Sequence, residues 1–152
     1  MCSIIHVNNE IGVAQPIKEI GALCRKKKVF FHTDAAQSVG KMPLDVKDLN
    51  IDMLSLSGHK IYGPKGVGAL YVSRKPRVRL HGQISGGGQE KGMRSGTLAP
   101  ALVVGLGEAC HVAKSEMQND ADHIEKLSKK FLKAMREEVT HIELNGDEHQ
   151  RY

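Results

Sequence analysis

Residues 53–72 read MLSLSGHKIYGPKGVGALYV, and this stretch decides the fold. Met53–Ser57 alternates apolar and polar side chains, which is typical of a β-strand, and Val67–Val72 predicts another strand. The turn Gly63–Gly66, which contains glycine and proline, separates the two. Because the intervening segment is too short to hold a crossover helix, we expect these strands to run antiparallel.

Upstream, the pattern is that of a strand, a helix and a second strand. Ser3–Val7 and Val29–Thr33 are short apolar runs of the strand type. Between them, Pro16 stands where a helix would begin. Residues at helical spacing follow it, namely Ile17, Ile20, Gly21 and Cys24. Such a unit predicts parallel strands, so the whole sheet is expected to be mixed.

Downstream, the glycine-rich loop Gly86–Thr97 leads into two predicted helices, each with one apolar face that we expect to pack in a core. A short strand is predicted at Ile142–Leu144, and Cys110 is expected to be buried. Because few residues follow the second helix, the chain is expected to be part of a longer protein. The apolar face of the first predicted helix consists of Leu102, Val103, Leu106, Cys110, Ala113 and Met117. The apolar face of the second consists of Ile124, Leu127, Phe131, Met135 and Val139.

Length and composition indicate a folded α/β chain and exclude several classes. The 152 residues, 40% of them hydrophobic, are enough for one domain. No apolar run approaches the length of roughly 18 residues that a transmembrane helix needs, and the start MCSIIHVNNE lacks the pattern of a signal peptide. Neither a membrane partner nor a targeting segment is therefore expected in this chain.

The net charge of +5 is scattered, and its densest runs are short. Arg25–Lys28 stands at the end of the first predicted helix, where cations meet the negative end of the helix dipole. Arg74–Arg79 has no interleaved aromatic residues, so a nucleic-acid partner is not expected. This second run is either a docking patch for an acidic partner or an ordinary solvated loop. The cysteines form no C-x-x-C pair and the histidines lack metal-ligand spacing, so no metal site is expected.

Polar residues follow three of the predicted strands, at Asn8–Glu10, at Asp34 with Gln37, and at Ser57–Lys60. Ligands of open α/β sheets collect beyond the carboxyl ends of the strands. Pyridoxal phosphate needs a lysine for its Schiff base, an acid for its ring nitrogen, and donors for its phosphate. Taken alone, Asp34 reads as a helix cap or turn residue and Lys60 as a surface lysine. Their joint placement favours a pyridoxal phosphate site.

Four ordered blocks of the sequence resemble cysteine desulfurases of the IscS/NifS type, which are fold-type I pyridoxal phosphate enzymes of aminotransferase class V. The similarity runs from about Ser3 to Asp147. The RSGT form of the glycine-rich loop resembles the IscS/NifS group more than the SufS or selenocysteine lyase branch, and the whole block resembles the mitochondrial version. The blocks are HVNNEIG (His6–Gly12), HTDAAQSVGK (His32–Lys41), SLSGHKIYGPKGVGALY (Ser55–Tyr71) and GGGQEKGMRSGT (Gly86–Thr97).

The resemblance implies an α/β fold in two parts. Residues 1–115 would be the central part of the pyridoxal phosphate-binding large domain, with a mixed, mostly parallel sheet and flanking helices. Residues 116–152 would be a linker helix and the beginning of the small α+β C-terminal domain.

The resemblance also implies the roles of site residues. Lys60 would be the catalytic lysine that carries the cofactor, and Asp34 would pair with the pyridine nitrogen. Asn9 and Gln37 would lie near the phenolic oxygen, with Asn9 also placed to meet the substrate.

Three further residues would contact phosphate. Ser57 and His59 would donate to the phosphate of the cofactor. Thr97 would reach the phosphate of the neighbouring subunit's cofactor, since members of the family are homodimers with their sites at the interface.

The implied reaction converts L-cysteine to L-alanine and leaves sulfur as a persulfide for iron–sulfur cluster synthesis. Implied protein partners are the iron–sulfur scaffold protein, accessory small subunits and frataxin, for which Arg74–Arg79 is a candidate docking surface. The implied location is the mitochondrial matrix, with the cytoplasm as the alternative.

The sequence also departs from the family pattern. The sulfur-accepting cysteine of the family lies on a flexible loop of the S-S-G-S-A-C type, and none of Cys2, Cys24 and Cys110 matches it. The upstream phosphate-binding turn and the imidazole that stacks on the ring are absent too. We therefore expect these residues alone to be inactive and to bind pyridoxal phosphate weakly or not at all.

Two other interpretations stay open at this point. One is a short non-catalytic homologue that dimerises with a full-length desulfurase through Gly86–Thr97. The other is a fragment of a related lyase that acts on selenocysteine or cysteine sulfinate.

Overall fold

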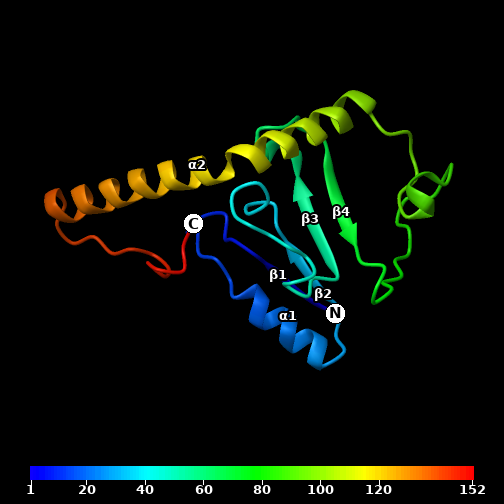
Figure 1. Ribbon diagram of the computed structural model, residues 1–152, viewed down its shortest axis with the longest axis horizontal. Helices are drawn as coiled ribbons and strands as arrows, with labels where there is room; N and C mark the ends of the chain where they lie inside the picture. Colours follow the sequence, from blue (N-terminus) through cyan, green and yellow to red (C-terminus); the bar gives the residue numbers. More distant parts are fainter.

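The computed structural model describes all residues, 1–152, and contains one four-stranded sheet in the order β1-β2-β3-β4 (Figure 1). Strands β1 (Cys2–Ile5), β2 (Phe31–Asp34) and β3 (Met53–Ser57) are parallel. Strand β4 (Gly68–Val72) runs antiparallel to β3. The predicted mixed sheet and its antiparallel last strand are confirmed.

Helix α1 (Ile17–Lys26) connects β1 to β2 and supplies one side of the core (Figure 1). Gly21 allows the close approach of the helix, because a Cβ there would lie 2.0 Å from the carbonyl oxygen of Leu49. At the end of the helix, Arg25 forms an ion pair of 3.2 Å with the buried carboxylate of Asp52. The core cluster consists of Ile17, Cys24, Phe31, Ala35, Ile51 and Leu54.

The turn between β3 and β4 contains the short 3₁₀-helix η1 (Gly58–Ile61), which ends at Tyr62 in the left-handed conformation. The N–H of Gly58 donates to the carbonyl of Val67 at 2.9 Å, and the N–H of Gly63 donates to the carbonyl of Gly58 at 2.9 Å. These backbone bonds fix the turn that carries Lys60.

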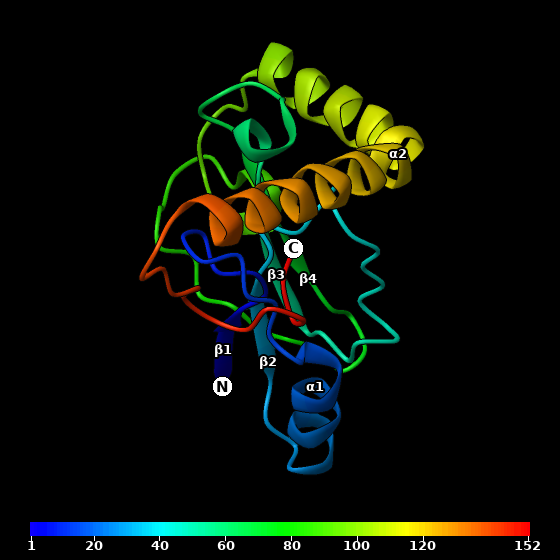
Figure 2. The same cartoon turned by 90° about the vertical axis from the view of Figure 1, so that its left-hand side faces the viewer.

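Helix α2 (Pro100–Glu138) is one continuous helix of 39 residues, so the prediction of two helices is wrong. The segment 118–123, between the two predicted apolar faces, contains no glycine or proline that would interrupt a helix. Within it, the side chain of Gln118 donates to Asp122 at 2.8 Å. The helix passes over the η1 turn at the end of the sheet (Figures 1 and 2).

The first expected face of α2 is confirmed only in part. Four of its residues are half-buried, namely Leu102, Leu106, Ala113 and Met117, whereas Val103 and Cys110 are exposed. Small residues make the close contacts: a Cβ at Gly105 would lie 2.6 Å from Cγ of Pro64, and the Cβ of Ala113 lies 2.9 Å from the position of a Cβ at Gly40. Cys110 is exposed, so its predicted burial is wrong.

The second predicted apolar face does not pack in a core, because α2 contains no buried residue. Leu127 and Phe131 on this face are 52% and 62% exposed. No helix in the structure is long and apolar enough to cross a membrane.

No strand forms at Ile142–Leu144, where one was predicted. A strand needs a paired neighbour, and the structure pairs a later segment instead. The tail returns to the loop after β1, where Arg151 forms an antiparallel bridge with Val13 (Figure 1).

Candidate functional site

The three parallel strands bring their carboxyl ends to one edge of the sheet. In the register, Ile5 lies beside Asp34, and Asp34 lies beside Ser55. The polar segments that follow β1, β2 and β3 therefore start from the same edge, which is where α/β sheets bind ligands.

The loop after β1 uses one asparagine for its own structure and leaves the next one free. The side-chain oxygen of Asn8 accepts hydrogen bonds from the N–H groups of Glu10 at 2.9 Å and Ile11 at 3.0 Å. Asn9 is exposed, and its amide makes no side-chain hydrogen bond. The free amide of Asn9 is therefore the one available to a ligand.

The turn after β2 positions Asp34 and Gln37. One carboxylate oxygen of Asp34 accepts a hydrogen bond from the N–H of Ala36 at 2.9 Å, which fixes the orientation of the side chain. The second oxygen has no protein partner and is free to accept another donor. Gln37 is half-buried in the same turn, and its side chain has no hydrogen bond.

A buried pair, His6 and Ser38, connects these two loops and was missed by the sequence analysis. The backbone N–H of His6 donates to the carbonyl of Asp34 at 2.9 Å. The side-chain Nδ1 of His6 lies 2.9 Å from Oγ of Ser38. Burial lowers the pKa of His6, so the imidazole is held neutral. The available signal was position alone, since each residue lies close in sequence to a predicted site residue, Asn9 or Gln37.

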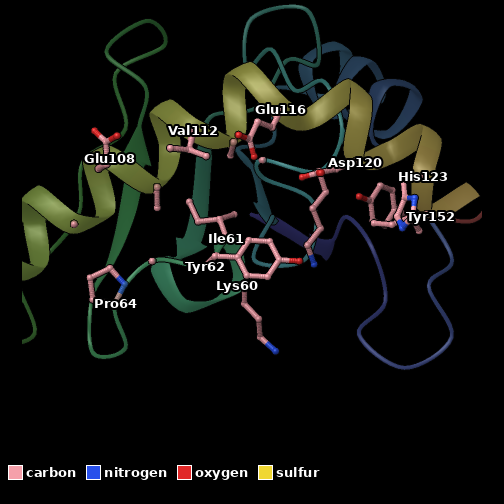
Figure 3. A pocket seen from close by; sticks show the side chains of 17 residues that line it. Lys60, Ile61, Tyr62, Pro64, Glu108, Val112, Glu116, Asp120, His123 and Tyr152 are labelled. Carbon is pink, nitrogen blue, oxygen red and sulfur yellow. The ribbon is translucent and has the colours of Figure 1, made fainter.

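The turn after β3 carries the other predicted residues. Oγ of Ser57 lies 2.9 Å from Nδ1 of His59, so a hydroxyl and an imidazole stand together. Lys60 is exposed, and its amine forms neither a hydrogen bond nor an ion pair within the chain. In Figure 3 its side chain points away from α2.

A cavity of about 840 Å³ is lined by residues of the η1 turn and of α2 (Figure 3). Lys41 and Lys60 belong to its lining on the sheet side, while Glu116 and Asp120 come from α2. Burial lowers the pKa of Lys41, and the positive charge of Lys60 lowers it further. Both lysines line this one cavity.

Thr97 lies apart from this group, in the loop that precedes α2. The loop is held by its own hydrogen bonds, from the N–H of Gly88 to Oγ of Ser95 at 3.2 Å and from the N–H of Gly96 to Gln89 at 2.9 Å. Thr97 itself is exposed and makes no hydrogen bond with its side chain. Its role toward a second subunit stays a prediction.

The free groups at the sheet edge suit pyridoxal phosphate. Lys60 offers a primary amine without a competing partner, and Asp34 offers a carboxylate oxygen for a protonated ring nitrogen. The Ser57–His59 pair offers donors for a phosphate. No group of three metal-ligating side chains is present in the structure.

Comparison with known proteins gives a consistent result. The family model described as aminotransferase class-V matches residues 1–152. The mitochondrial cysteine desulfurase of Arthroderma benhamiae is 62% identical over the whole chain, and cysteine desulfurase IscS of Rickettsia bellii is 59% identical. The chain spans only 30% and 37% of the lengths of these two relatives.

Solved structures of similar proteins share the fold. DndA from Streptomyces lividans superposes with a TM-score of 0.86 at 39% identity, covering 98% of this chain and 42% of DndA. SspA in complex with cysteine superposes with a TM-score of 0.69 at 57% identity, covering 72% of this chain and 31% of SspA. The predicted fold class is confirmed.

Proposed function

Because the chain belongs to the aminotransferase class-V family, we propose that it is the central part of a pyridoxal phosphate-dependent cysteine desulfurase. In the proposed reaction, L-cysteine and an enzyme thiol give L-alanine and an enzyme persulfide, so every atom is accounted for. The structural observation that carries the proposal is the unpartnered amine of Lys60 at the same sheet edge as the carboxylate of Asp34.

The roles of the residues follow from their free groups. Pyridoxal phosphate, when bound, supplies an electron sink that weakens bonds at the α-carbon of the substrate. Lys60 holds the cofactor through Nζ and then moves the proton at the α-carbon, as a lysine amine does when it acts as a base. Asp34 keeps the ring nitrogen protonated through its free oxygen, which Ala36 leaves unoccupied. Asn9 and Gln37 contact the phenolic oxygen, and Asn9 also binds the substrate.

The phosphate contacts involve two subunits in this proposal. Ser57 and His59 donate to the phosphate within one subunit, where they already stand 2.9 Å apart. Thr97 donates to the phosphate in the other subunit of a homodimer, in line with its exposed position on a separate loop.

The sulfur acceptor is not among the cysteines of this chain. Cys2 lies on β1, Cys24 on α1 and Cys110 on α2, so each is held on a regular element and none lies on a loop. We place the persulfide-forming cysteine outside residues 1–152, and these residues alone then do not complete the transfer of sulfur.

The remaining parts of the proposal concern organisation, partners and location. Residues 1–115 belong to the large domain, and residues 116–152 form the linker helix and the start of the small domain. The exposed basic run Arg74–Arg79 docks acidic partners, for which the iron–sulfur scaffold protein, accessory small subunits and frataxin are candidates. The mitochondrial matrix is the proposed location, since several relatives carry the word mitochondrial in their names while others are bacterial.

The experiment uses the natural full-length chain that contains these residues, with Lys60→Ala as the variant and Lys65→Ala as the control. Lys65 is an exposed lysine of the same turn. After borohydride reduction, mass spectrometry locates the pyridoxyl label, which we expect on the peptide containing Lys60. Formation of alanine and persulfide from L-cysteine should be lost in Lys60→Ala and kept in Lys65→Ala. A label on another lysine, or an active Lys60→Ala variant, refutes the assignment.

A further inference from the structure

The segment after α2 is an ordered unit that is built by its own polar contacts. The carboxylate of Asp147 accepts the N–H groups of His149 at 2.7 Å and Gln150 at 2.8 Å, which closes a turn. The guanidinium of Arg151 donates to the carbonyl of Asp147 at 3.3 Å and to the carbonyl of Asn145. Arg151 therefore joins both sides of the turn 145–151.

This segment pairs with the loop that carries Asn9. The N–H of Ala14 donates to the carbonyl of Gln150 at 2.8 Å, and the N–H of Tyr152 donates to the carbonyl of Gly12 at 3.0 Å. Val13 and Arg151 form the antiparallel bridge between these two bonds. In Figure 1 the two segments lie side by side, although almost the whole chain separates them in sequence.

Two glycines show that the approach is close. Gly12 has φ +69°, and a Cβ there would lie 3.0 Å from the carbonyl oxygen of Tyr152. Gly146 has φ +86°, and a Cβ there would lie 2.5 Å from Cγ2 of Val13. Both positions favour glycine for its backbone conformation and for its lack of a side chain.

The base of the Asn9 loop is closed by its own backbone pairing: Val7 forms an antiparallel bridge with Ala14, and the N–H of Gln15 donates to the carbonyl of His6 at 2.7 Å. Within it, Asn8 forms the turn described above, and its N–H donates to the carbonyl of Val13 at 2.9 Å. Asn9 is exposed at the tip. A displacement of about 1 Å in a substrate-positioning group is enough to change a rate by a large factor.

We propose that residues 145–152 form a clamp that holds the Asn9 loop in place, with Arg151 as the positioning residue. The clamp positions Asn9 for binding the substrate. This effect on substrate binding rests on the proposed function. Arg151 touches neither the substrate nor the cofactor in this proposal. It keeps the turn 145–151 in the shape that presents the carbonyl of Gln150 to Ala14.

The experiment compares Arg151→Ala, Arg151→Lys and the control Gln150→Ala in the natural full-length chain. Gln150 is a matched control because its backbone carbonyl, and not its side chain, pairs with Ala14. In Arg151→Ala we expect faster amide hydrogen exchange in residues 8–14 and a KM for L-cysteine raised about tenfold, with kcat near the wild-type value. Arg151→Lys should recover part of the loss, and Gln150→Ala should behave as the wild type.

Retained cofactor absorbance and an unchanged melting temperature in Arg151→Ala distinguish positioning from general destabilisation. Unchanged exchange and an unchanged KM in Arg151→Ala overturn the proposal, as does a fall in kcat without a change in KM. If the wild type forms no alanine from L-cysteine, the proposed function fails, and the exchange of residues 8–14 still tests the clamp itself.

Discussion

At the scale of single residues, His6 determines how the two ligand-facing loops lie relative to each other. Its backbone N–H contacts Asp34 and its Nδ1 contacts Ser38, both at 2.9 Å, and its side chain is buried. A protonated imidazole at this position would be a buried cation without an anionic partner, which is why burial lowers its pKa. The geometry of the site therefore depends on a neutral histidine.

The first prediction is that His6 makes the protein sensitive to mild acid. Its pKa in the folded state lies below the ordinary value of 6.5, so the unfolded state binds more protons as pH falls below that value. The contribution of neutral His6 to folding stability is therefore complete above pH 6.5 and declines as the pH falls below that value. The variant His6→Asn keeps a polar group near the position of Nδ1 and does not titrate. When the pH is lowered from neutral to 5, the free energy of unfolding of His6→Asn should fall less than that of the wild type. Urea unfolding at the two pH values measures this difference.

A control for this prediction is His141→Asn, since His141 is exposed. This variant should follow the wild-type pH profile. A His6→Asn profile parallel to the wild type would show that His6 does not carry the acid sensitivity.

At the scale of elements, the position of the Lys60 turn depends on how closely α2 can approach it. Gly105 contacts Pro64, and Ala113 contacts Gly40, whose own Cβ position lies 2.9 Å from Cγ2 of Ile61. Small side chains at this contact let the helix lie directly on the turn. The same helix contains Gly107, where a Cβ would meet no atom within 4 Å.

The second prediction compares these two glycines. Gly107→Ala should stabilise the protein by roughly 0.5–1 kcal/mol, because alanine is the better helix former and the site is open. Gly105→Ala should destabilise it by about 1–3 kcal/mol, since its Cβ would press on Pro64 and overpack the contact. It should also weaken retention of pyridoxal phosphate. Thermal unfolding and cofactor content after dialysis measure both effects, and equal stabilisation by the two variants would contradict the assigned contact.

The same contact shows where prediction from sequence succeeded and where it failed. Short-range patterns determine strand ends, so Asp34 and the Ser57–Lys60 turn could be located at one sheet edge from alternation and turn residues alone. Helix α2 packs through Gly105 and Ala113. The periodicity of apolar residues found Ala113, but it missed Gly105, which carries no hydrophobic signal, and it included the exposed Cys110. His6 and Ser38 were missed because their contact spans 32 positions and leaves no local pattern.

At the scale of the whole molecule, residues 1–152 leave much apolar surface uncovered. Only 17 of the 152 residues are buried, and α2 contributes none of them. Leu70 and Tyr71 of β4 are 52% and 37% exposed. Exposed apolar groups of this extent mark surfaces that other polypeptide covers or that associate non-specifically.

The last prediction follows from this exposure. Residues 1–152 produced as an isolated polypeptide should bind a hydrophobic fluorescent dye and self-associate, whereas the natural full-length protein should do neither to the same degree. The double variant Leu127→Gln and Phe131→Gln, on the exposed face of α2, should reduce dye binding without changing helix content by circular dichroism. Lys126→Gln is the matched control on the same helix and should leave dye binding unchanged. A monomeric isolated polypeptide that binds no dye and unfolds cooperatively would contradict this prediction, since it would show that the exposed faces of β4 and α2 need no further covering.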